Sequence, residues 1–139
     1  MIADRNEIDD EPEIDLPPLE HFTLGFQEFC EARYFEAHDT WEDFWHGLRG
    51  PDRRFVQGLI HLAVGAYHYE NDNPAGAGSQ WSKARTKLSE YPVGHWGVDV
   101  RGWLAWIDHY TKSKEPRANL PRLTFDPSAF PAKLIMAKG

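Results

Sequence analysis

Residues 51–71 read PDRRFVQGLIHLAVGAYHYEN and predict one long helix. At 100° per residue its polar side chains fall within a strip about 60° wide, and apolar side chains occupy most of the remaining surface. A helix that is apolar almost all round belongs to a core, so we expect the strip to be buried. Gly58 and Gly65 lie beside the strip and leave room for another helix or a small ligand. The strip consists of Arg54, Gln57, His61 and His68.

The preceding segment, about residues 35–48, predicts a second helix with its aromatic side chains on one arc. Gly50 and Pro51 separate the two helices, because glycine closes a helix and proline suits the first turn of the next. A connection this short makes the helices antiparallel neighbours, so facing residues have numbers with a nearly constant sum. The facing pairs are His38 with His61, Glu42 with Gln57, and Trp45 with Arg54.

These pairs predict a polar seam between two core helices. In one interpretation the seam is a satisfied buried network in which Arg54 binds Glu42 and only geometry is fixed. In another it is a site for acid/base chemistry or for a small polar ligand, with Glu42 as base or charge anchor, His38 as proton partner and Arg54 as anion clamp. The other candidate ligand-binding residues are Gln57, His61, Trp45 and His68.

A third interpretation of the seam is a metal site. His38 and Glu42 lie four residues apart on one helix face and would chelate an ion together with His61 from the facing helix. No metal is favoured, because Arg54 would repel a cation and a single His-x-x-x-Glu pattern is weak. The sequence identifies no cofactor.

Three further helices are expected. Leucine and phenylalanine at three- and four-residue spacing predict a helix over 19–32, Asn73 and Pro74 begin another, and a last one covers about 99–111. Four prolines after Lys112 prevent a continuous helix but leave apolar residues to bury. The predicted fold is an all-α, compact bundle of about five helices. Its parts are an acidic disordered tail over 1–18, a helical bundle domain over 19–111 and an irregular tail packed on the bundle over 112–139.

Length and charge exclude several classes of protein. The 139 residues fit one domain, and the net charge is −7. Residues 1–18 hold seven acids and one base, so the remaining chain is nearly neutral and binding to nucleic acid is not expected. No signal peptide and no long apolar stretch is visible, so we expect a cytoplasmic protein without membrane contact.

The remaining reactive side chains are few. The single cysteine, Cys30, falls on an apolar helix face and is predicted to be a buried thiol. No Gly-rich phosphate loop, Gly-x-Ser-x-Gly elbow or Cys-x-x-Cys pair occurs. Four further histidines are interpreted as isolated surface or boundary residues: His21, His46, His95 and His109.

Two stretches carry a family resemblance. Residues 35–45, FEAHDTWEDFW, and 55–68, FVQGLIHLAVGAYH, resemble the small all-helical bacterial and archaeal proteins of the domain of unknown function 309 family, and looser similarity covers about 22–110. The resemblance implies a compact helical bundle and no established activity or substrate. Asp39 stands where the family usually has Glu, and His61 where Gln is frequent. Since Gln is a poor metal ligand, the second departure weighs against the metal interpretation.

Our hypothesis is therefore a helical-bundle protein of unknown function whose polar seam binds a small polar ligand or supports acid/base chemistry. The rival is a non-catalytic interaction or scaffold protein. In the rival the seam only sets helix register, and an exposed aromatic surface binds a partner or a second copy in a homo-oligomer.

Overall fold

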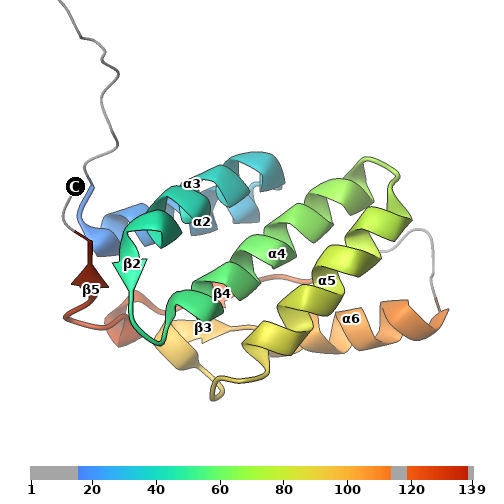
Figure 1. Ribbon diagram of the computed structural model, residues 1–139. Coiled ribbons are helices and arrows are strands. Elements are labelled where there is room, and N and C mark those ends of the chain that lie inside the picture. Colours follow the sequence, from blue (N-terminus) through green and yellow to red (C-terminus); the bar gives the residue numbers. More distant parts are fainter. Residues whose placement is uncertain (1–15, 114–118, 138–139) are drawn as a thin grey trace, which may run out of the picture.

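Helices form nearly all of the structure, as Figure 1 shows. The computed structural model describes residues 16–113 and 119–137. Its α-helices are α2 (Pro18–Cys30), α3 (Tyr34–Gly47), α4 (Arg53–Glu70), α5 (Pro74–Leu88) and α6 (Arg101–Ser113). Consecutive helices pack against one another from α2 to α5, α6 lies against α5, and α3, α4 and α5 run side by side (Figure 1). The prediction of an all-α bundle is confirmed.

Local sequence explains where the helices begin and end. Gly50 has a φ of +96° in the turn between α3 and α4, a conformation that glycine adopts without strain. α5 begins at Pro74, and the side chain of Asn73 caps it by accepting a hydrogen bond from the Gly76 backbone N–H at 3.0 Å. α4 itself covers Arg53–Glu70, against the predicted 51–71.

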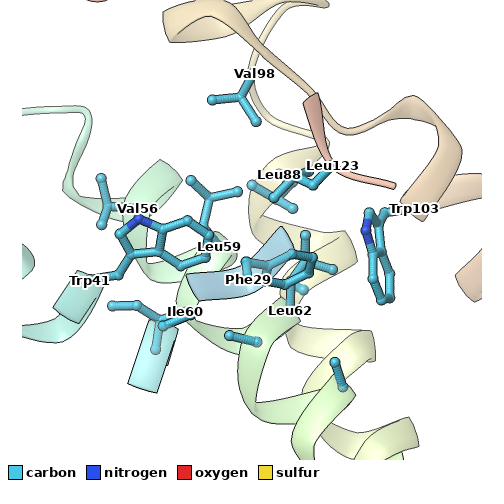
Figure 2. Packing of buried hydrophobic residues seen from close by; sticks show 14 of the residues in the cluster. Phe29, Trp41, Val56, Leu59, Ile60, Leu62, Leu88, Val98, Trp103 and Leu123 are labelled. Atoms are coloured by element: carbon cyan, nitrogen blue, oxygen red, sulfur yellow. The ribbon is translucent and has the colours of Figure 1, made fainter. Parts of the chain in front are cut away.

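The core lies between the helices and is rich in aromatic rings. Figure 2 shows Trp41 of α3 and Trp103 of α6 on opposite sides of aliphatic side chains from α4. Both indoles are fully buried. The Trp41 Nε1–H donates to the Phe22 carbonyl of α2 at 3.1 Å, so this polar atom is satisfied inside the core.

The two glycines of α4 admit α5. A Cβ at Gly65 would overlap the indole of Trp81, and a Cβ at Gly58 would lie 2.7 Å from Cδ2 of Leu88. The Trp81 Nε1–H donates to the Leu62 carbonyl at 3.3 Å, which fixes the indole against α4. The space beside Gly58 and Gly65, which the sequence analysis assigned to another helix or to a small ligand, is therefore filled by the helix α5.

Two short sheets attach the C-terminal segment to the bundle. β2 (Leu48–Arg49) pairs antiparallel with β5 (Ile135–Met136), and β3 (Val98–Asp99) pairs antiparallel with β4 (Thr124–Phe125). The Phe125 ring stacks on Phe26 of α2, with centroids 4.7 Å apart. The segment after α6 is thus held by strand pairing as well as by apolar packing, and the sequence analysis missed the strands.

Cys30 is exposed, so the predicted buried thiol is wrong: it ends α2, and its Sγ lies 3.7 Å from the Leu123 carbonyl oxygen. Residues 1–15 lie outside the described part of the chain, so the acidic tail stays a prediction, although α2 already begins at Pro18. Among the described helices, none combines the length and apolar character needed to cross a membrane.

Candidate functional site

The polar strip of α4 reaches solvent, so the expectation that it is buried is wrong. Arg54 is exposed, and Gln57, His61 and His68 are half-buried, whereas most of the remaining residues of the helix are buried. The reason is the arrangement of the layer: α3 and α5 cover the two flanks of α4 and leave one narrow side open between them (Figure 1). The strip is therefore the open side of α4.

Arg54 binds a residue that the sequence argument did not consider. Its Nε donates to both carboxylate oxygens of Glu90, each at 2.8 Å, and Glu90 follows the end of α5. The predicted ion pair between Arg54 and Glu42 is wrong, because Arg54 turns toward α5 and away from α3. Glu42 therefore keeps its negative charge free of this guanidinium.

His61 also turns toward α5. Its Nδ1 lies 2.7 Å from Oε1 of Gln80, and because an amide oxygen only accepts, Nδ1 is the donor of this hydrogen bond. Burial lowers the pKa of His61; the hydrogen bond to Gln80 raises it, and Lys87 and Lys83 lower it. The predicted pairing of His61 with His38 across α3 and α4 is replaced by this bond.

His38 and Glu42 do lie together, one turn apart on α3. The Nε2 atom of His38 is 3.8 Å from Oε1 of Glu42, and its Nδ1 is 3.3 Å from Oδ1 of Asp39. Nδ1 is fully buried and has no hydrogen-bond partner among the described residues. One ligand atom from each of the three residues lies within 4.8 Å of the others. These three residues, which we call the His38 group, form the cluster of metal-ligating side chains found in the described part of the chain.

The charges at this group limit its chemistry. Each ring nitrogen of His38 faces a carboxylate oxygen, Nδ1 that of Asp39 and Nε2 that of Glu42. A ring nitrogen and a carboxylate oxygen repel each other unless a proton or another cation lies between them. The arrangement can therefore hold a proton for acid/base work or bind a metal ion.

His68 takes the place beside His38 that the sequence assigned to His61. Both line a small, mostly apolar hollow of about 170 Å³, together with Phe35, Val64 and Tyr67. The Phe35 and Tyr67 rings are 5.4 Å apart, and both residues are exposed. The hollow could hold the apolar part of a small molecule bound at His38.

The last two predicted site residues differ in their surroundings. Trp45 contacts Arg53 and not Arg54: its Nε1–H donates to the Arg53 carbonyl at 3.0 Å, and the Arg53 guanidinium lies 3.9 Å from the ring centroid. Trp45 thus joins α3 to the start of α4. Gln57 is half-buried, and its side chain makes no hydrogen bond with the residues that the structure describes.

The sequence did not predict the pairing of His95 with Asp52. His95, interpreted as isolated, has its Nε2 2.8 Å from Oδ1 of Asp52 just before α4, and its ring lies 4.7 Å from Phe55 and 4.8 Å from Tyr91. No local pattern could have found it, because the partners are 43 residues apart. It ties the loop after α5 to the start of α4.

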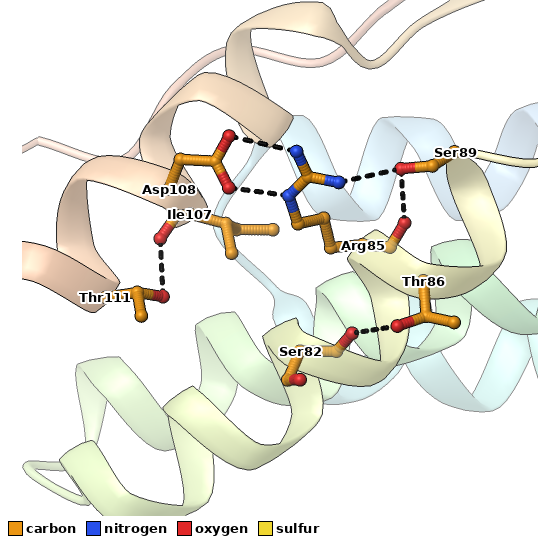
Figure 3. Close-up of polar contacts among 7 residues, drawn as sticks. All are labelled: Ser82, Arg85, Thr86, Ser89, Ile107, Asp108 and Thr111. Carbon is orange, nitrogen blue, oxygen red and sulfur yellow. Dashed lines mark hydrogen bonds and ion pairs between the residues drawn. The ribbon is translucent and has the colours of Figure 1, made fainter.

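A larger cavity lies elsewhere, between α5 and α6, with a volume of about 930 Å³. Figure 3 shows the Arg85 guanidinium of α5 bound by two parallel contacts to the Asp108 carboxylate of α6, both of which line this cavity. These opposite charges neutralise each other, and no predicted site residue lines the cavity. The His38 group is therefore the better candidate for chemistry.

Comparison with known proteins finds one family that part of the chain is similar to. No curated protein matches it. The sequence pattern of the family described as "Domain of unknown function (DUF309)" matches residues 22–79. That range contains α3, α4 and the His38 group, and the family description states no activity. The match covers less than half of the chain and leaves α6 and the C-terminal segment outside it, so residues 22–79 are similar to the DUF309 family.

Proposed function

We propose that this domain binds a divalent transition-metal ion between Nε2 of His38 and the carboxylate of Glu42, with Asp39 beside them. The observation that carries the proposal is the 3.8 Å separation of Nε2 and Oε1 across one helical turn. Imidazole and carboxylate together suit first-row metals such as zinc, iron and manganese.

The distance fits an ion after a small rotation. Ligand atoms about 2.1 Å from a metal are about 3.0 to 3.4 Å apart in octahedral or tetrahedral geometry. The Glu42 side chain is 45% exposed, so its carboxylate is free to move the few tenths of an ångström required. Asp39 can act as a third ligand or can accept the Nδ1 proton of His38, as carboxylates do behind many metal-binding histidines.

The strongest sequence argument against a metal no longer applies. Arg54 was expected to repel a cation at Glu42, but its guanidinium is bound to Glu90. The predicted ligand His61 is not part of the proposed site, since it is held by Gln80.

The proposed site is open and has room for a small polar ligand. Two or three protein ligands leave coordination positions for water or for an oxygen of a bound molecule. The hollow lined by Phe35, Val64, Tyr67 and His68 would receive a short apolar portion of that molecule. Without a metal, the same His38–Glu42 pair would support acid/base chemistry. We further place the protein in the cytoplasm, because a chain with one cysteine is typical of reducing compartments.

One observation favours a second candidate function. The aromatic pair Phe35 and Tyr67 is 50% and 38% exposed, as in an interaction or scaffold protein that uses this face for a partner or a second copy. Sedimentation of the wild-type chain and of Phe35→Ser tests it. A dimer that Phe35→Ser dissociates supports this second candidate, and a monomer at all concentrations removes the homo-oligomer.

Calorimetric titration of chelator-treated protein with Zn²⁺ and Mn²⁺ tests the metal proposal. We expect binding of one ion per chain and at least a tenfold loss of affinity in Glu42→Gln. Glu36→Gln is the matched control, since Glu36 is an exposed carboxylate on the same helix outside the group. Equal affinity in Glu42→Gln and wild type, or no binding of either ion, would overturn the proposal.

A further inference from the structure

Two lysines of α5 face the open side of α4. Lys83 and Lys87 lie one turn apart, and both ammonium groups are close enough to the His61 ring to lower its pKa. Lys87 is half-buried, and its Cβ would lie 3.4 Å from a Cβ built on Gly58. The Cβ end of the Lys87 side chain therefore packs over Gly58, beside the strip.

The positive charge of these lysines is not neutralised. Neither Lys83 nor Lys87 forms an ion pair or a hydrogen bond within the described residues. The nearby carboxylate of Glu90 is occupied on both oxygens by Arg54. A half-buried lysine without a counter-charge is costly in the free protein, and an anion would offset that cost.

Neutral donors stand beside the lysines. Gln57 lies one turn before His61 on α4 and directly precedes Gly58, over which Lys87 packs. Its half-buried amide has two N–H groups without a partner in the described chain. Ammonium and amide N–H groups on two neighbouring helices are donors of the kind that match the acceptors of an oxyanion. The partly buried surroundings strengthen each of these contacts relative to bulk water.

We propose that Lys83, Lys87 and Gln57 form an oxyanion-binding site for a carboxylate or phosphate group at the α4–α5 edge of the strip. This site is separate from the proposed metal site on α3 and needs no metal. Together the two sites would give the open face of the helical layer an acidic side on α3 and a basic side on α5.

Titration of the full chain with inorganic phosphate, and separately with acetate, tests this site. Both are done with a chelator present and at constant ionic strength set by chloride, so that the result does not depend on the metal proposal. We expect a saturable shift of the Gln57 side-chain amide in ¹H–¹⁵N NMR spectra. A response to one anion but not the other supports the site and identifies the group that it accepts.

The variants separate a site from general charge. Lys83→Gln with Lys87→Met should weaken binding at least tenfold, and methionine keeps the apolar stem that covers Gly58. Lys133→Gln, which removes an exposed cation in the C-terminal segment, should leave the affinity unchanged. The proposal is overturned by a linear response without saturation, by equal binding in the double variant, or by equal losses in the double variant and Lys133→Gln.

Discussion

Replacing Gly65 by alanine tests how closely α4 and α5 approach each other. In a helix interior, alanine is more favourable than glycine by about 1 kcal/mol. At Gly65 this gain is opposed, because the added Cβ would overlap Cδ1 and Nε1 of the Trp81 indole. Trp81 is 1% exposed and therefore cannot move outward without disturbing the core.

The overlap has two costs. Overpacking a close-packed core costs about 1 to 3 kcal/mol. Displacing the indole also breaks the 3.3 Å hydrogen bond from its Nε1–H to the Leu62 carbonyl, and an unpaired buried donor costs about 1 to 3 kcal/mol. After the gain in helix propensity is subtracted, we expect Gly65→Ala to lower the free energy of unfolding by about 3 kcal/mol.

Gly78→Ala in α5 is the matched control. No atom lies within 4 Å of the Cβ that it would add, so it should raise the free energy of unfolding by about 0.5 to 1 kcal/mol. Urea denaturation at 25 °C, followed by tryptophan fluorescence and far-UV circular dichroism, measures both changes. If Gly65→Ala is as stable as Gly78→Ala, α5 does not pack on α4 as described and the reasoning is refuted.

Three further predictions concern ionisable side chains. Burial lowers the pKa of His21 from 6.5, so on acidification the unfolded chain takes up this proton at a higher pH than the folded chain does, and the free energy of unfolding falls as the pH is lowered from 7.5 to 5.5. His21→Gln should reduce this fall, measured as urea midpoints. His61, whose pKa is also lowered, should account for part of the fall that remains. Hydrogen bonds from the side chain and backbone of Arg101 lower the pKa of Asp99 to about 2, and a carboxylate titration by NMR should show it rising toward 3.8 in Arg101→Gln; no change in that variant would contradict the assignment. Cys30 is exposed, so a thiol reagent should modify it in the native protein without prior unfolding, slowed only by its contact with the Leu123 carbonyl, and complete protection in the native state would contradict its position.

The fold follows from the sequence because apolar periodicity reports burial around each helix. The observed bounds of α4, Arg53–Glu70, differ from the predicted 51–71 by two residues at one end and one at the other. The short strands could not be predicted, since each has two residues and the pairing of Leu48 with Met136 depends on tertiary structure. A two-residue strand has no periodicity that a sequence pattern could display.

The candidate site was predicted in part. His38 and Glu42 lie together because residues four apart on one helix are neighbours on its surface, whatever the helix packs against. The cross-helix partners were wrong, because a helical wheel gives the direction of Arg54 and His61 but not which neighbouring helix covers which flank. Both residues found partners on the α5 side, at Glu90 and Gln80, which the two-helix argument did not include.

The proposed metal site requires a cation between Nε2 of His38 and the carboxylate of Glu42. Long-range ¹H–¹⁵N spectra of the imidazole rings, recorded at pH 7.5 with and without one equivalent of Zn²⁺, report on this atom. With Zn²⁺ bound, we expect a large change at Nε2 of His38, with the proton of that ring on Nδ1, and no metal-induced change in His61 or His95. Zinc-induced changes spread over all the histidines, or an unchanged His38, would contradict it.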